Sequence, residues 1–302
     1  MPARFRRERI LIVGCGDIGL RVLRLLPSSV SRLALSSSPA RGPELRAHGA
    51  RVLLGDLDQA QTLSRLSGVA TRVLHLAPPA VDAAAPQDDR SRALVHALGR
   101  RSAARSWVYG STSGVYGDCG GDWVSEARPL NPSTARAKRR VDAEQVLRAS
   151  GRRAGVRVTV LRIPGIYAPD RAGGTPRERL MRGLPVLREA DDVFTNHIHA
   201  NDLARACVLA LWRGLPQRVI NVSDDTQLRM GEYMRLAARL YALPEPQQVS
   251  RAEAAKSLTP MALSFMGESR RLLNQRMKAE LRLRLSHPTV VTGLLSSGPA
   301  AR

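Results

Sequence analysis

ILIVGCGDIG, residues 10–19, joins a run of branched apolar residues to a glycine-rich turn. The run ILIV is short and continuous, as in a β-strand that is buried on both faces. The next segment, DIGLRVLRLL at 17–26, has apolar residues at helical spacing and ends before Pro27. The stretch therefore predicts a strand, a tight turn and a helix.

The glycines of this turn form the pattern GxGxxG. In a strand–turn–helix unit the first glycine permits the tight turn, the second lets the backbone approach a pyrophosphate, and the third lets the helix pack closely on the strand. The helix N-terminus adds free N–H groups for the phosphates. We therefore predict a dinucleotide-binding loop of Gly14, Gly16, Asp17, Ile18 and Gly19. The alternative is a glycine turn without a ligand.

The same alternation continues through the first half of the chain. Short apolar runs, each followed by a turn or an amphipathic segment, predict further strands at 31–38, 50–57, 71–79, 105–113 and 156–165. Helix patterns lie between them, the clearest at 88–101 and 133–150. Strands that alternate with helices are typical of an α/β protein. The predicted fold is a Rossmann-type doubly wound parallel sheet with a small C-terminal substrate lobe.

The pattern changes near residue 165, where loops rich in proline and glycine interrupt the alternation. We predict an NAD(P)-binding Rossmann domain at 1–167 and mainly a substrate-binding lobe at 168–302. Residues 193–223 contain a strong helix pattern followed by the apolar run RVINV. We therefore expect this part of the second half to return to the sheet.

The second predicted strand ends in serines rather than in a carboxylate. An acidic residue at this point accepts hydrogen bonds from the adenosine ribose of NAD, whereas an arginine nearby accommodates the 2′-phosphate of NADP. This chain has Ser36, Ser37 and Ser38, with Arg41 close behind and no carboxylate before Glu44. We predict NADP as the preferred cofactor and NAD as the alternative.

Residues after the third and fourth predicted strands complete the expected cofactor site. Asp56 and Leu57 follow the third strand, and Asp56 is placed to accept a hydrogen bond from the adenine amino group. Ala77 and Pro78 follow the fourth strand and would line the far side of the cofactor. Ligands of open α/β sheets bind outside the carboxyl ends of the strands, where all these residues are expected.

The chain is strongly basic, with a formal net charge of +21 at pH 7 over 302 residues. Its basic residues are scattered arginines with only three lysines, so we expect no specific nucleic-acid partner. No apolar run is long enough to span a membrane, and the expected location is the cytoplasm without a membrane partner. The three cysteines, Cys15, Cys119 and Cys207, show no metal-ligand spacing, so we predict no metal site.

Further motifs follow along the chain in a characteristic order: GDL at 55–57, HLAPP at 75–79, YGSTSGVYGD at 109–118, RPLNPSTARAKRRVDAEQ at 128–145, VLRIPGIYAPDR at 160–171, IHANDLA at 198–204 and NVSDD at 221–225. Over residues 9–225 the chain thereby resembles the extended short-chain dehydrogenases/reductases, the NAD-dependent epimerase/dehydratase group. Two features depart from that family: GxGxxG replaces GxxGxxG, and Thr134 replaces the tyrosine of Tyr-x-x-x-Lys. Both departures resemble the atypical branch of the family, which keeps the fold and often lacks the tyrosine.

The resemblance implies a set of catalytic residues. Thr112 would hold the substrate oxygen, and Lys138 would hydrogen-bond the nicotinamide ribose and supply positive charge. Thr134 stands where the family has its acid/base tyrosine, and an aliphatic hydroxyl is a far weaker acid than a phenol. Tyr116, Tyr109 or a water held by Thr112 and Lys138 are alternative proton carriers.

The predicted substrate side lies after the sixth strand. Arg162 and Arg171 belong to the motif there, and arginines suit a phosphate or a carboxylate. Asn196, His197 and His199 are the other predicted substrate-binding residues. For the two histidines, hydrogen bonding within a turn is the alternative.

Two functions follow from these residues. The first is an NAD(P)-dependent oxidoreductase or epimerase-like enzyme that acts on a nucleotide-sugar or a similar anionic alcohol with non-standard acid/base chemistry. The second is a dinucleotide-binding sensor or scaffold with little or no turnover. Thr134 favours the second, whereas Thr112, Lys138 and the loop arginines favour the first. The resemblance also implies a homodimer.

Overall fold

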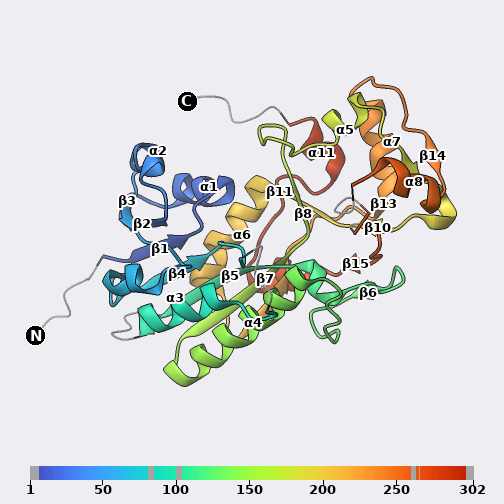
Figure 1. The fold of residues 1–302 in the computed structure, drawn as a ribbon. Coiled ribbons are helices and arrows are strands. Elements are labelled where there is room, and N and C mark those ends of the chain that lie inside the picture. Colours follow the sequence, from blue (N-terminus) through green and yellow to red (C-terminus); the bar gives the residue numbers. More distant parts are fainter. Residues whose placement is uncertain (1–6, 81–84, 100–103, 260–262, 265, 297–302) are drawn as a thin grey trace, which may run out of the picture.

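Seven parallel strands form the central sheet of the computed structural model, which describes residues 7–80, 85–99, 104–259, 263, 264 and 266–296 (Figure 1). In their order across the sheet, the strands are β12 (Arg218–Asn221), β7 (Arg157–Ile163), β5 (Ser106–Thr112), β4 (Arg72–His75), β1 (Arg9–Val13), β2 (Ser31–Ser36) and β3 (Arg51–Leu54). This confirms the predicted α/β fold with a parallel, Rossmann-type sheet.

The central strands consist of continuous apolar runs. Because helices cover both faces of the sheet, side chains that point to either face are buried. In the centre, Leu11 pairs with Leu33 of β2 on one side and with Val73 of β4 on the other. The strands are shorter than the sequence predicts, most clearly β2, which ends at Ser36, β3, which ends at Leu54, and β4, which ends at His75. Proline lacks the N–H that a ladder needs, so the two prolines after β4 lie beyond its end.

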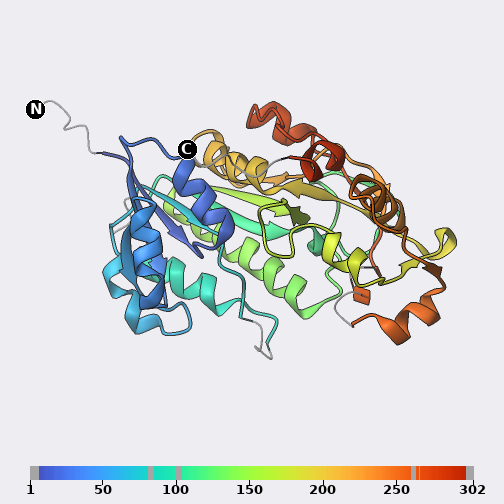
Figure 2. The same cartoon turned by 90° about the horizontal axis from the view of Figure 1, so that it is seen from above.

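Helices cover the two faces of the sheet (Figure 2). One face packs against α1 (Asp17–Leu25), α2 (Gly42–Ala47), α6 (Ala200–Arg213) and α10 (Gln275–Glu280). The other face packs against the 3-10 segment η2 (Ala60–Leu66), α3 (Asp89–Gly99) and α4 (Ala135–Ala154). Within the described ranges, no helix is both long enough and apolar enough to cross a membrane.

A smaller group of elements lies beyond the carboxyl ends of the strands (Figure 1). It is held by a cluster of apolar side chains that includes Tyr167, Val186 and Tyr233. Its members are α5 (Arg177–Met181), η4 (Glu189–Asp191), α7 (Met230–Leu240), α8 (Arg251–Ser257), α11 (Val290–Leu294) and the strand pairs β9 (Val186–Leu187) with β14 (Gln248–Val249) and β10 (Phe194–Thr195) with β13 (Leu228–Arg229).

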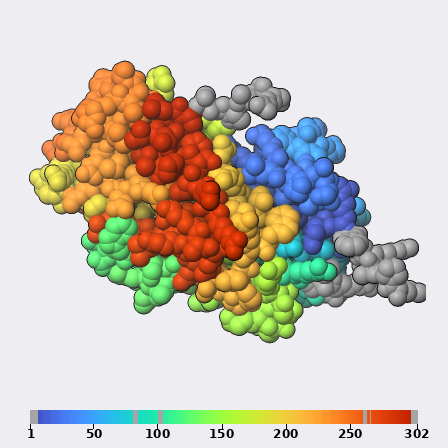
Figure 3. Space-filling model, turned by 180° about the vertical axis from the view of Figure 1, so that it is seen from behind, coloured from blue at the N-terminus to red at the C-terminus, as the bar shows by residue number. Residues whose placement is uncertain are grey.

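Two further strand pairs connect this group to the sheet. They are β8 (Gly165–Tyr167) with β11 (His197–His199), and β15 (Arg271–Leu272) with β6 (Trp123–Val124). Seen from behind, the C-terminal segment lies between the outer elements and α6 (Figure 3). The segment therefore joins parts of the chain that are far apart in sequence.

Candidate functional site

The glycine loop between β1 and α1 leaves one side open. Gly14 has φ +79°, and a Cβ there would lie 2.3 Å from the backbone nitrogen of Ala77. A Cβ on Gly16 would meet no atom within 4 Å, whereas one on Gly19 would lie 3.0 Å from Cys15 Sγ. Gly14 and Gly19 thus serve packing, while Gly16 borders open space.

This open side suits the phosphates of a dinucleotide. Gly16 is the N-cap of α1 and makes no side-chain cap, so the N–H groups of the first turn remain for an anion. Asp17 begins the helix and accepts a hydrogen bond from Arg21 Nε at 3.0 Å. Ile18 is half-buried and packs against the core beneath the loop. The loop therefore fits the pyrophosphate of a nicotinamide dinucleotide.

The serines and the arginine predicted to read the adenosine ribose lie beside this loop. Ser36 ends β2, and its hydroxyl donates to the carbonyl of Ser38 at 3.0 Å, while Ser37 is exposed. Arg41, in the 3-10 segment η1 (Pro39–Arg41), donates from Nη1 to the Cys15 carbonyl at 2.8 Å. Arg41 also pairs with Glu44. A guanidinium thus lies between the end of β2 and the glycine loop.

The other predicted cofactor residues surround the same edge of the sheet. Asp56 follows β3, and its Oδ1 accepts from the backbone N–H of Asp58 at 3.0 Å. Leu57 packs against the apolar cluster under α3. The backbone of Ala77 packs directly against Gly14. Pro78 is exposed, and its carbonyl accepts a hydrogen bond from Arg90. These contacts leave the Asp56 carboxylate half-exposed at the sheet edge.

A cavity of about 850 Å³ lies where β5, β7 and the outer elements meet. Its wall contains six arginines and, among the described residues, a single carboxylate. The polar and charged residues of the wall include Thr112, Thr134, Arg136, Arg140, Arg171, Arg179, Arg182, Asn196, His197, Glu268 and Arg270. The wall is therefore strongly cationic.

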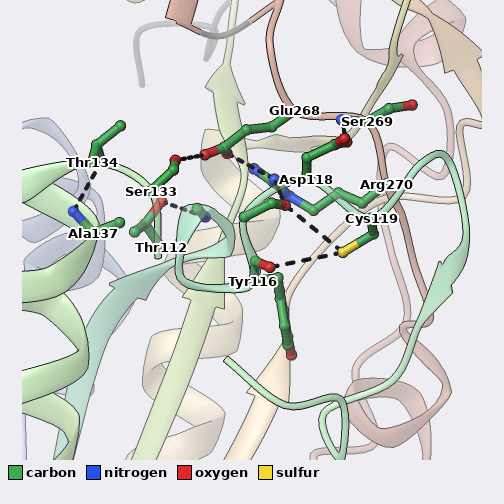
Figure 4. A network of polar contacts seen from close by, with 12 residues as sticks. Thr112, Tyr116, Asp118, Cys119, Ser133, Thr134, Ala137, Glu268, Ser269 and Arg270 are labelled. Atoms are coloured by element: carbon green, nitrogen blue, oxygen red, sulfur yellow. Dashed lines mark hydrogen bonds and ion pairs between the residues drawn. The ribbon is translucent and has the colours of Figure 1, made fainter. Parts of the chain in front are cut away.

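Two predicted catalytic threonines line this cavity, and both hydroxyls accept hydrogen bonds from backbone (Figure 4). Thr112 ends β5, and its Oγ1 accepts from the N–H of Gly114 at 3.2 Å. Thr134 is the N-cap of α4, and its Oγ1 accepts from the N–H of Ala137 at 3.1 Å. Thr134 thus acts as a helix N-cap, a position that threonine commonly occupies.

The predicted lysine of α4 lies outside the cavity. Lys138 is exposed and is not part of the wall. Arg140, two residues later, does line it. Arg140 Nη1 donates to the Gly110 carbonyl at 2.5 Å and to the Tyr109 hydroxyl at 3.1 Å.

The two tyrosines considered as proton carriers are buried away from the cavity wall. The Tyr116 hydroxyl donates to Asn221 Oδ1 at 2.7 Å, and burial raises the pKa of this tyrosine. Burial likewise raises the pKa of Tyr109 to about 12. Neither phenol is poised to give up a proton, because each is desolvated.

Arg162, predicted to bind substrate, instead forms a buried ion pair inside the protein. Its Nη2 lies 2.7 Å from Glu144 Oε2, and both side chains are almost fully buried. Ser111 donates to the other oxygen of Glu144 at 2.6 Å. The cluster ties β5 and β7 to α4, and Arg162 does not line the cavity.

Arg171 and Asn196 do line the cavity, but both have partners in the protein. Arg171 Nε lies 3.5 Å from Asp17 at the start of α1. Asn196 donates to the Arg270 carbonyl at 2.9 Å and accepts from the N–H of Leu272 at 2.8 Å. Asn196 therefore fixes the segment that carries β15.

The two predicted histidines differ in position. His197 lines the cavity, packs against the Tyr233 ring at 4.2 Å between centroids, and has a pKa lowered to about 4 by burial. His199 instead caps α6, where its Nδ1 accepts from the N–H of Asn201 at 3.2 Å. His199 therefore makes a hydrogen bond within a turn, which was the alternative to a role in substrate binding.

The structure also brings in residues that the sequence does not reveal. Glu268 accepts from the Ser133 hydroxyl at 2.7 Å and pairs with Arg270 at 2.8 Å (Figure 4). Arg179 donates to the Pro185 carbonyl, and burial alone lowers its pKa. These residues lie in segments without a recognisable motif. Only their position in the folded chain shows that they share one wall.

Comparisons with known proteins agree with this architecture. The chain is similar to a functionally unknown conserved protein from Silicibacter pomeroyi, with 32% identity, a TM-score of 0.79, and 95% of this chain and 96% of that chain covered. It is also similar to UDP-glucose 4-epimerase from Thermotoga maritima, with 18% identity, a TM-score of 0.77, and coverage of 95% and 96%. The dTDP-glucose 4,6-dehydratase DesIV from Streptomyces venezuelae, solved with NAD bound, is 20% identical with a TM-score of 0.75 and coverage of 95% and 94%.

No curated protein matches the chain. A family model does match it, over residues 10–223, and carries the description NAD dependent epimerase/dehydratase family. The matched range includes the glycine loop, both threonines and the ion pair of Glu144 with Arg162. The chain therefore belongs to the NAD dependent epimerase/dehydratase family.

Proposed function

We propose that this protein is an NAD(P)-dependent oxidoreductase or epimerase-like enzyme that acts on a nucleotide-sugar or a similar anionic alcohol. One observation carries the proposal: the open side of the glycine loop and the arginine-lined cavity lie at the same edge of the sheet. Gly14 follows β1 and Thr112 ends β5, and these strands run parallel through β4. Open α/β sheets bind ligands at this edge.

The glycine loop would hold the pyrophosphate of the cofactor, and Arg41 would lie at the adenosine ribose. Because Arg41 lies between the end of β2 and the glycine loop and no carboxylate occurs from Ser36 to Arg41, the geometry favours a 2′-phosphate and hence NADP. Four neighbours that resemble this chain in fold were solved with NAD, so NAD is the alternative. A nicotinamide dinucleotide supplies a hydride acceptor and donor when it is bound.

The substrate oxygen would lie near Thr112, whose hydroxyl still has a proton to donate because its oxygen accepts from Gly114. An arginine cannot take up or release a proton near neutral pH. Among the described residues of the wall, Glu268 and His197 are the side chains able to exchange one. The proton path would therefore run through one of these groups or through water, without a tyrosine.

The arginines of the wall support an anionic substrate. Arg179 is half-buried, burial lowers its pKa, and among the residues that the structure describes no carboxylate offsets this lowering. Arg182, the residue directly after α5, is exposed and also lines the cavity. Buried cations without counter-charges are costly, and a phosphate or carboxylate of the substrate would remove that cost.

Binding of NADPH and NADH, followed by nicotinamide fluorescence, tests the proposal. We expect micromolar binding, with NADPH tighter, and loss of binding in Gly16→Asp, which places a carboxylate where the phosphates would lie. The matched control is Gly99→Asp, at an exposed glycine that also has open space around it. Absence of binding to both dinucleotides would reject the proposed function, and NADH tenfold tighter than NADPH would reject the cofactor preference.

A sensor or scaffold with little turnover is the second candidate. The observation that favours it is the use of the Thr134 hydroxyl as a helix cap, together with the buried Tyr116. This protein would bind the dinucleotide as expected above. It would leave the absorbance of bound nicotinamide unchanged across a panel of nucleotide-sugars, whereas an enzyme would change it with at least one of them.

A further inference from the structure

Glu268 is the single carboxylate among the described residues of the cavity wall, and two partners fix its position (Figure 4). Its Oε1 accepts a hydrogen bond from the Ser133 hydroxyl at 2.7 Å, and its Oε2 accepts one from Arg270 Nη1 at 2.8 Å. Arg270 Nη1 also donates to the Gly117 carbonyl at 2.6 Å, so the same guanidinium holds the backbone shortly after β5. The carboxylate is therefore fixed between the residue before Thr134 and the chain that follows β5.

This carboxylate borders the place where the substrate oxygen would lie. A Cβ built on Gly114 would be 3.6 Å from Thr112 Oγ1 and 3.9 Å from Glu268 Oε2, so the two oxygens lie around one point. A side chain that exchanges a proton with a substrate must reach the reacting atom directly or through one water. A substrate hydroxyl that is bonded to Thr112 lies within that reach of Glu268.

Glu268 also has the capacity to accept a proton there. An ionised carboxylate has about four acceptor sites. The bonds from Ser133 and Arg270 occupy one site on each oxygen, so both oxygens keep a further site. The side chain is only 14% exposed, and it borders the cavity, so the substrate would be its main neighbour beyond these two partners.

His197, the other described group of the wall that can exchange a proton, is less suited to this step. It lies in β11, and its ring packs against Tyr233 of α7. A histidine gains a positive charge with a proton, and burial opposes that charge at His197 and lowers its pKa. A carboxylate instead becomes neutral when it accepts a proton, a change that partial burial assists.

Resting on the proposed function, we propose that Glu268 is the catalytic acid/base of this protein. When the substrate alcohol is oxidised, its O–H and C–H bonds break, and the electron pair of the O–H bond becomes the second bond of a C=O group. The proton moves to the Glu268 carboxylate, and the hydride, with the electron pair of the C–H bond, moves to an oxidised nicotinamide dinucleotide. In the reverse direction Glu268 returns the proton as an acid.

The rate of a single turnover tests this role. The probe is the nucleotide-sugar of the panel described above that changes the absorbance of bound nicotinamide fastest. Glu268→Gln keeps an acceptor for Ser133 but cannot take up the proton, so it should slow this change by about 100-fold or more. The dissociation constant of NADPH should stay within about twofold of wild type, because Glu268 faces the substrate.

Glu178→Gln is the matched control, since it neutralises an exposed carboxylate of α5 that is not part of the wall. It should change neither the rate nor the binding of NADPH. Glu268→Asp keeps a shorter carboxylate and should retain more of the rate than Glu268→Gln.

Two further measurements separate proton transfer from a structural role. Formate or acetate should restore part of the rate of Glu268→Gly, because a small carboxylate can enter the space that the side chain leaves. The wild-type rate should fall as acid protonates the carboxylate, and this fall should be absent from the residual rate of Glu268→Gln. A residue that only holds the wall in place would give neither result.

Three outcomes would overturn the inference and leave the proposed function standing. They are a Glu268→Gln rate within about threefold of wild type, a loss of rate in Glu268→Gly that neither formate nor acetate reverses, and a loss of NADPH binding in Glu268→Gln. Dinucleotide binding without any absorbance change across the panel would favour the sensor or scaffold and reject a catalytic Glu268. No dinucleotide binding by the wild-type protein would reject the proposed function itself.

Discussion

The hydroxyl of Thr134 already has a partner, and this explains the residue better than any role in proton transfer. Threonine at an N-cap accepts a hydrogen bond from the third helical N–H, and Thr134 does so with Ala137. A tyrosine cannot make this bond, because its hydroxyl lies far from the backbone. The sequence could show that the tyrosine is absent, but only the structure shows what the threonine does instead.

Thr134→Ala should therefore lower the free energy of unfolding by about 1 kcal/mol, the usual cost of losing a threonine N-cap. Thr134→Ser should retain most of that stability, since it keeps the accepting oxygen. Urea unfolding followed by circular dichroism measures both. Equal stability of Thr134→Ala and wild type would show that the cap contributes nothing.

Helix α4 shows why an element is easier to predict than its limits. The pattern predicts a helix at 133–150, and the helix spans Ala135–Ala154. Gly151 looks like a stop signal, yet it remains helical. A Cβ there would lie 2.4 Å from the side chain of Val158 in β7, so the glycine allows α4 to pack closely on β7. The true stop is Gly155, in a left-handed conformation with φ +64°.

The same helix decides which predicted site residues reach the cavity. A spacing of four residues from Thr134 points to Lys138 by analogy with the family. The wall, however, contains Arg136, Ala137 and Arg140. Sequence motifs placed the helix correctly at the carboxyl edge, but the rotation of the helix about its axis depends on packing against β5 and α3 that no motif records.

The buried pair of Glu144 and Arg162 anchors α4 to β7. Glu144→Ala should reduce the free energy of unfolding by about 3–5 kcal/mol, because it leaves the arginine charge buried and unpaired. Gln145→Ala, at the next and exposed position of the helix, is the control and should have little effect. Chemical denaturation of both variants measures the difference, and similar values for the two would contradict a structural role for the pair.

At the scale of the molecule, the sequence predicts the sheet well and the cavity poorly. Repeated strand–helix patterns specify the sheet locally, so each strand could be recognised alone. The cavity wall combines residues near 112–140, 164–197 and 259–270. The last group, which contains Glu268 and Arg270, has no recognisable sequence motif. Its place in the cavity wall depends on the pairing of β15 with β6, which the sequence does not reveal.

Asp224 lies where the sheet meets the outer elements, and its N–H donates to the carbonyl of His197 at 2.7 Å. Burial raises the pKa of its carboxyl from 3.8 to about 7. Between these values the folded protein binds a proton that the unfolded chain does not, so this contribution to stability is complete below about pH 4 and is lost as the pH rises to about 7.

Relative to Asp224→Asn, the wild-type protein should therefore lose about 2 kcal/mol of stability between about pH 5 and pH 7, at roughly 1.4 kcal/mol for each pH unit. His197 and His199, whose pKa values burial lowers to about 4, change stability in the opposite direction, but both remain in the variant. Denaturation of both proteins across this range gives the difference. A difference that does not vary with pH would mean that Asp224 titrates normally.

The parallel pairing of β15 with β6 has a consequence for the time course of biosynthesis. A ribosome makes the chain from its N-terminus, and domains begin to fold as they emerge. All seven strands of the sheet exist once Asn221 has been made, but the wall of the cavity still lacks Glu268 and Arg270. A nascent chain at that stage has its glycine loop and its sheet, and it acquires the complete wall of the cavity only when the segment around Arg271 has been added and has paired with Trp123.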